Sequence, residues 1–143
     1  MKPADPAPAP TELLQNLFPG ISTAYDPIES PNPEGESIVE LHDRCERVLS
    51  AMIRRLDEHP DQPSSVLVCT HAATFVGLCR ALGGNRPQDP TTVDFVPYTS
   101  CITVFERSGL SAESTSPTPK GGDWVCKTNG DCSFLSLGKH RGW

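Results

Sequence analysis

The chain has 143 residues, a length that suits one small domain or a large part of one. Its formal net charge is −6. That charge gives no general attraction to nucleic acid or to anionic membranes. A membrane helix needs about 20 consecutive apolar residues, and every apolar segment of this sequence is much shorter. The opening MKPADPAPAP lacks the apolar core of a signal peptide. The sequence therefore predicts a soluble cytoplasmic or nuclear protein that makes no direct contact with nucleic acid and none with a membrane.

The first 20 residues are predicted to form a tail rich in proline and alanine that ends in a short helix. Residues 1–10 alternate Pro and Ala, a composition that favours extended backbone and offers no face to bury. Residues 11–20 can form one or two helical turns, with Thr11 as the N-cap and Pro19-Gly20 as the stop. A loop is expected to follow.

A long amphipathic helix gives the strongest secondary-structure signal. Ser37, followed three residues later by Glu40, predicts a capping box, and apolar residues then recur at helical spacing until shortly before Pro60. The opposite face is charged, which is typical of a solvated surface rather than of a binding site.

Three strands are predicted further along the chain. Residues 66–69 are continuously apolar, as in an interior strand, and residues 74–82 predict a helix closed by two glycines. Residues 101–106 and 124–127 predict two strands joined as a hairpin with a long loop. Helices that alternate with strands indicate an α/β fold, in which we expect the three strands to share one sheet.

His71 stands where the first predicted strand passes into the following helix. In open α/β sheets, ligands gather at the carboxyl ends of strands, and the amide groups that open the next helix can help to hold an anion. The residues alone leave two interpretations. A histidine hydrogen-bonded to backbone in a turn is favoured over a group that contacts a ligand.

A family resemblance changes that balance. The pattern SVLVCTHAAT, preceded by a helix that begins GES and followed by one that ends RALGG, resembles the C-terminal half of the histidine phosphatase superfamily, the phosphoglycerate-mutase-like proteins. The likeness spans residues 35–125 and includes VDFVPYTSCITVFER. The ending WVCKTNGDCSFLSLGKHRGW resembles fungal members, among them the histidine-phosphatase-like subunit of the RNA polymerase III factor TFIIIC. The implied fold is a partial three-layer α/β/α sandwich without the family's N-terminal strand.

The resemblance implies a phosphate pocket around His71. Family members place a second histidine at this strand end, where it donates a hydrogen bond to the transferred phosphoryl group, so His71 is the candidate catalytic residue. His71 and Ala72 are candidate phosphate-binding residues, with Ala72 in place of the family's usual glycine. Glu36 is a third candidate, although its plain role is to precede the helix cap. Arg80 is expected to be either a surface charge or a helix-end charge that is favourable to the helix dipole.

The departure from the family pattern decides the expected activity. The defining R-H-G motif, which supplies the nucleophilic histidine and an arginine clamp, occurs nowhere in this sequence. The chain by itself is therefore expected to be inactive. Two functions remain open. In the first, the chain is a truncated member of a family whose intact members hydrolyse phosphate esters through phosphohistidine, and the sequence does not identify its substrate. In the second, the chain is a non-catalytic interaction subunit of a TFIIIC-type complex and binds protein partners.

The domain boundaries follow from the same resemblance. We expect the half-domain to cover residues 21–127 and a polar and aromatic tail to cover residues 128–143. Asn129-Gly130 favours a tight turn in that tail. The cysteines and the histidine near the C-terminus lack the paired ligand spacing of a structural zinc site, so neither a metal nor a cofactor is predicted.

Overall fold

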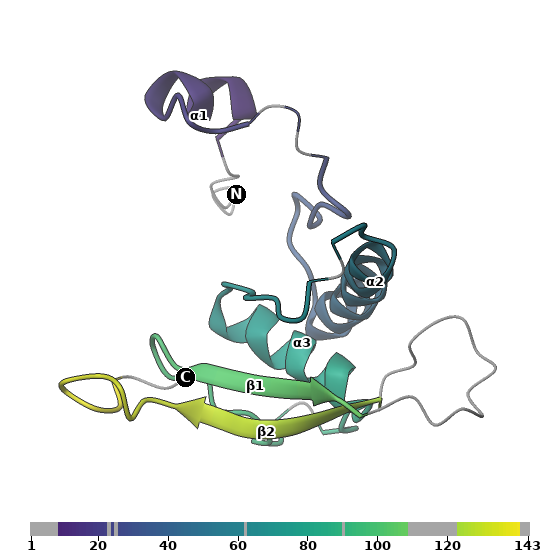
Figure 1. Ribbon diagram of the computed structural model, residues 1–143, viewed down its shortest axis with the longest axis vertical. Coiled ribbons are helices and arrows are strands. Elements are labelled where there is room, and N and C mark those ends of the chain that lie inside the picture. Colours follow the sequence, from purple (N-terminus) through teal and green to yellow (C-terminus); the bar gives the residue numbers. More distant parts are fainter. Residues whose placement is uncertain are drawn as a thin grey trace.

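The computed structural model describes residues 9–22, 24, 26–61, 63–89, 91–108 and 123–140. These residues form a mixed α/β structure of three helices and one two-stranded sheet (Figure 1). The elements in chain order are α1 (Thr11–Leu17), α2 (Ile38–Asp57), α3 (Ala72–Gly83), β1 (Ile102–Arg107) and β2 (Trp124–Asp131). The predicted α/β class is confirmed.

Helix α2 begins at the predicted capping box. The backbone N–H of Glu40 donates to Ser37 Oγ at 3.3 Å, and the backbone N–H of Ser37 donates to Glu40 Oε2 at 2.7 Å. These two bonds satisfy amide groups that have no partner within the helix. One stripe of the helix is buried, and its members are His42, Cys45, Leu49 and Ile53.

Helix α3 packs on that stripe and also on the sheet, so it lies between α2 and the hairpin (Figure 1). The two helices are in close contact where Gly77 faces Cys45, whose Sγ lies 3.9 Å from the carbonyl oxygen of Thr74. A Cβ atom at Gly77 would stand 2.8 Å from Cys45 Sγ, so the contact requires a glycine there. The helix ends at Gly84, which takes the left-handed conformation with φ 64°.

The hairpin forms as predicted, with β1 and β2 antiparallel. Its register shifts twice, between Ile102 and Val104 and again before Phe105. The prediction of a tight turn at Asn129-Gly130 is wrong, because both residues lie within β2 beside the first irregularity.

Gly130 is required at this irregularity for two reasons. Its φ is +65°, a conformation that side chains rarely adopt, and an added Cβ would lie 2.8 Å from the carbonyl oxygen of Val96. Its N–H donates to Thr103 Oγ1 at 2.9 Å.

The prediction of a strand at residues 66–69 is wrong. This stretch, hereafter the 66–69 segment, has no strand assignment, and no backbone hydrogen bond joins it to any other described residue. A strand needs the backbone of a neighbour, and the described sheet contains only β1 and β2. The apolar side chains of the segment are therefore exposed, with Leu67 83% accessible.

The short helix before Pro19 is confirmed, but its predicted cap is not. Pro10, rather than Thr11, is the N-cap residue of α1, and no side chain caps the helix. Figure 1 shows α1 apart from the other elements. Its large side chains are consequently exposed, Leu17 at 64% among them.

Replacing Gly77 with alanine tests the α2–α3 contact. The added methyl would press on Cys45 Sγ, so we expect Gly77→Ala to lower the free energy of unfolding by about 1–3 kcal/mol. Gly83→Ala is the matched control, because nothing lies within 4 Å of its Cβ position and alanine favours helix, which should stabilise by up to about 1 kcal/mol. Urea denaturation followed by circular dichroism measures both. Equal stabilities of the two variants would contradict the packing.

Candidate functional site

His71 is the N-cap residue of α3, directly after the 66–69 segment. Its backbone is extended, with φ −102° and ψ 163°, and its carbonyl oxygen accepts the N–H of Phe75 at 2.8 Å. Its imidazole is exposed and makes no hydrogen bond or ion pair with any residue that the structure describes. The side chain is thus available to a ligand or a partner.

The first turn of α3 places Ala72 next to His71. The amide groups of a first helical turn have no acceptor within the helix, and the positive end of the helix dipole lies there. The first turn of α3 holds no acidic residue that would oppose an anion. His71 and Ala72 thus share an exposed helix start, and their phosphate role stays a prediction.

Glu36 has a different neighbour. Its carboxylate accepts two hydrogen bonds from Arg44, from Nε at 2.5 Å and from Nη2 at 2.6 Å. The Arg44 hydrogen bonds lower the pKa of the Glu36 carboxyl, although burial opposes them. Among the described residues, no contact joins Glu36 to His71 or Ala72. The geometry gives Glu36 the role of anchoring Arg44 beside the start of α2.

Arg80 lies in the last turn of α3, as a helix-end charge does, but the alternative that it is a surface charge is wrong. Arg80 is only 5% exposed, and its guanidinium is held on three sides. Nε and Nη2 both donate to the Asp94 carboxylate at 2.9 Å, and Nη2 also donates to the carbonyl oxygen of Thr92 at 2.8 Å. Nη1 lies 3.2 Å from His42 Nε2. These residues form a polar network around the buried Arg80 and His42 that sequence reasoning missed.

The protonation of His42 follows from its two contacts. Nδ1 lies 2.7 Å from the carbonyl oxygen of Ile38, so it must donate, and Nε2 is left to accept from Arg80. The imidazole is neutral in this arrangement. A signal was present in the sequence, because His42 follows Ile38 and precedes Cys45 at helical spacing on the apolar stripe of α2.

Asp94 carries the negative charge of the network. Burial alone would raise the pKa of its carboxyl, but the hydrogen bonds and charge of Arg80 outweigh burial and lower it. The backbone continues the network, because the Asp94 carbonyl oxygen accepts a hydrogen bond from Asn129 Nδ2 at 2.9 Å. The carboxylate thus fixes Arg80, and its own backbone is fixed by β2.

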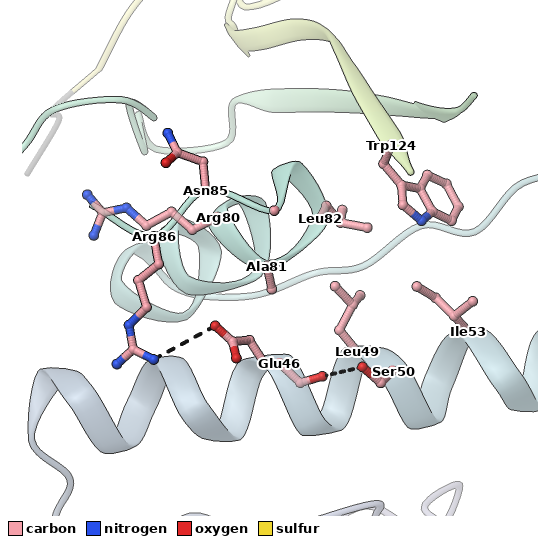
Figure 2. Close-up of a pocket in the computed structure, with 11 residues that line it drawn as sticks. Glu46, Leu49, Ser50, Ile53, Arg80, Ala81, Leu82, Asn85, Arg86 and Trp124 are labelled. Carbon is pink, nitrogen blue, oxygen red and sulfur yellow. Dashed lines mark hydrogen bonds and ion pairs between the residues drawn. The ribbon is translucent and has the colours of Figure 1, made fainter. Parts of the chain in front are cut away.

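A hollow of about 270 Å³ lies between α2 and the C-terminal end of α3. Figure 2 shows Leu49 and Ile53 pointing from α2 toward Trp124, and Arg86 paired with Glu46, whose Oε1 lies 3.8 Å from Arg86 Nη1. His71 stands at the other end of α3 and does not line this hollow.

The described residues contain no group of three or more His, Cys, Asp or Glu side chains that could hold a metal ion. None of the described helices is both long enough and apolar enough to cross a membrane.

The mixed α/β architecture and the helix start at His71 agree with a family match. Residues 19–115, more than half of the chain, match the model of the histidine phosphatase superfamily (branch 1). The chain belongs to this superfamily.

One relative matches almost the whole chain. This chain is 28% identical over 157 aligned residues to the transcription factor tau 55 kDa subunit of Saccharomyces cerevisiae. The alignment covers 99% of this chain and 36% of that protein, so the chain spans about a third of its relative's length.

The lowered pKa of Asp94 predicts a pH dependence. A carboxyl whose folded pKa lies below the unfolded value of about 3.9 stabilises the fold above that value, and the stabilisation is lost as pH falls through the folded pKa. We expect the free energy of unfolding to fall as pH is lowered from 5 to 3, and to fall less steeply in Asp94→Asn.

At pH 7 the same substitution leaves the Arg80 charge buried without its partner, and we expect a loss of about 3 kcal/mol in urea denaturation. Asp61→Asn removes the same charge from a side chain that is 89% exposed and serves as the control. Asp94→Asn with wild-type stability at pH 7 would show that the ion pair does not hold the fold.

Proposed function

We propose that this chain is a non-catalytic, protein-binding module of a nuclear transcription factor complex of the tau type, in the fungal branch of its superfamily. The observation that carries the proposal is the match to the tau 55 kDa subunit, which runs over 99% of this chain. The partner is then another protein subunit, and binding to nucleic acid belongs to the complex rather than to this acidic chain.

The surface features of the chain support a binding role. The 66–69 segment has no backbone partner among the described residues and exposes Val66 at 49%, Leu67 at 83% and Val68 at 46%. Contiguous exposed apolar side chains commonly mark contact sites, and a strand added by a partner would satisfy the open backbone groups. We assign the contact to this segment.

The chemistry of the chain supports the same role. Covalent phosphoryl transfer needs a nucleophile with an activating or charge-neutralising neighbour, and the R-H-G motif that supplies them in this superfamily is not in the sequence. His71 alone offers binding and polarisation. We therefore expect that this chain alone does not hydrolyse phosphate esters.

A second candidate function rests on His71. Its exposed and unbonded imidazole at the start of α3 suits contact with a phosphoryl group, together with the amide group of Ala72. This role requires an R-H-G motif from elsewhere in a longer protein. The substrate would then be a phosphate ester, which the chain does not specify further.

The binding proposal is tested by replacing Leu67 with glutamate. Co-expressed subunits of a tau-type complex should retain the wild-type chain on affinity purification, and Leu67→Glu should weaken binding about 10–100-fold because a large apolar side chain no longer becomes buried. Leu137→Glu, at a residue 78% exposed in another segment, is the matched control and should bind normally. If the two folded variants bind equally well, the contact does not lie in the 66–69 segment.

The phosphatase alternative has its own test. The isolated chain should not hydrolyse p-nitrophenyl phosphate above the rate of its His71→Ala variant. In a longer protein that carries an R-H-G motif, His71→Ala should lower the rate about 10²–10³-fold, since one charge-stabilising donor is lost. Hydrolysis by the isolated chain that depends on His71 would overturn the non-catalytic proposal.

A further inference from the structure

Two cysteines follow the last residue pair at the open end of the hairpin. Ile102 pairs with Asp131 in the antiparallel register, so continuing that register outward from the strands brings Cys101 opposite Cys132. The Cys132 thiol is close enough to contribute to the raised pKa of the Cys101 thiol. Opposed residues of an antiparallel pair have Cα atoms about 4.5 or 5.5 Å apart, and both separations fall within the range that a disulfide bond spans. All of the cysteines are free thiols in this structure.

The backbone around the pair is held in place on both sides. On the β1 side, the N–H of Cys101 donates to the carbonyl oxygen of Tyr98 at 3.2 Å, and Ser100 takes a left-handed turn with φ 59°. On the β2 side, the carbonyl oxygen of Cys132 accepts the N–H of Leu135 at 3.0 Å. The N–H of Thr99 donates to the His140 carbonyl oxygen at 3.1 Å, which brings the C-terminal segment back against the β1 turn.

The thiols differ in access. Cys132 is only 4% exposed, whereas Cys101 is half-buried, so a small reagent reaches Cys101 first. Burial raises the pKa of the Cys101 thiol, and the neighbouring Cys132 adds to that effect. Cys79 lies near the pair but is a poor competitor, since burial raises the pKa of its thiol to about 12.

We propose that Cys101 and Cys132 form a reversible disulfide that locks the open end of the hairpin, with a small-molecule disulfide such as oxidised glutathione as the oxidant. The Cys101 thiolate, after losing its proton to solvent, attacks one sulfur of the glutathione disulfide. One glutathione leaves as a thiolate and takes up a proton. Cys132, likewise deprotonated, then attacks the Cys101 sulfur and releases the second glutathione. Two protein thiols are oxidised, and one small disulfide is reduced to two thiols.

The bond would join the turn before β1 to the end of β2. Closing the loop between residues 101 and 132 restricts the unfolded chain, so we expect the oxidised protein to melt about 5–10 °C higher than the reduced protein. Excess reduced glutathione should reverse the change. The hairpin and the returning C-terminal segment would then respond to the thiol–disulfide balance of the compartment.

Peptide mapping of the full chain tests the proposal, because trypsin releases Cys101 and Cys132 in two different peptides. Cys101 falls in peptide 81–107 and Cys132 in peptide 128–139, and neither peptide holds another cysteine. The folded protein, with the exposed Cys69 and Cys126 replaced by serine, is treated with oxidised glutathione at pH 8 and then alkylated. We expect one cross-linked peptide pair, 81–107 with 128–139, and faster formation at pH 9, because the thiolate of Cys101 becomes more abundant.

Variants make the outcome decisive. Cys101→Ser should leave Cys132 alkylated and should abolish the rise in melting temperature on oxidation. Cys132→Ala should instead leave glutathione on Cys101 as a stable mixed disulfide. A cross-link between Cys101 and Cys79, or recovery of both residues of the pair as alkylated thiols after exposure at pH 9, would overturn the proposal.

Discussion

The buried charge of Arg80 is the constraint on which the rest of the structure depends. A guanidinium that is 5% exposed must have its donors satisfied. Its partners come from two places in the chain, and one of these is held in turn by a third. His42 lies on α2, Asp94 and Thr92 lie in the connection to the hairpin, and Asn129 of β2 holds the Asp94 backbone. Because the apolar core is small, this polar network does much to decide how the helices and the sheet are arranged. Removing Asp94 leaves the buried Arg80 charge without the carboxylate that balances it.

The network divides α3 into two functionally different ends. At the C-terminal end, Arg80 is fixed by neighbours on α2 and in the connection to the hairpin, and Gly84 caps the helix. At the N-terminal end, the His71 side chain is exposed and has no hydrogen-bond or ion-pair partner among the described residues, and the preceding 66–69 segment has no backbone partner among them. The middle of the helix packs on Cys45 of α2, so the exposed groups lie at the start of a helix that is held in place. This arrangement suits a rigid element that displays a contact surface.

The sequence predicted the elements whose signals are local. The capping box of Ser37 and Glu40 defines the start of α2 within four residues, and β-branched and aromatic residues mark β1. Family membership could likewise be predicted, because its motif around His71 is contiguous. Elements that depend on distant partners could not be predicted in this way. Residues 66–69 have the composition of an interior strand, but a strand also needs a neighbouring backbone, and the described residues offer none.

The candidate site shows the same division. Arg80 has the sequence context of a helix-end charge, and nothing local reveals that Asp94 and His42 would enclose it. Gly130 follows Asn129 as in a tight turn, yet the carbonyl oxygen of Val96 and the hydroxyl of Thr103 make it part of an irregular strand. In both cases, contacts between residues far apart in sequence override a local preference.

The energetics of the 66–69 segment limit what it can do as a contact. Fully burying a large apolar side chain contributes about 1.5–3 kcal/mol. Val66, Leu67 and Val68 are 49%, 83% and 46% exposed, so burying the surface that is still accessible contributes about 3–5 kcal/mol in total. Association itself costs at least about 4 kcal/mol, so these side chains alone cannot hold a stable complex. A lasting partner must also pair with the open backbone groups or cover other apolar surface, such as the outward face of the hairpin at Ile102 and Val125. In the proposed contact, Leu67, the most exposed of the three side chains, would bury the most apolar surface, and the segment would form one part of a larger interface.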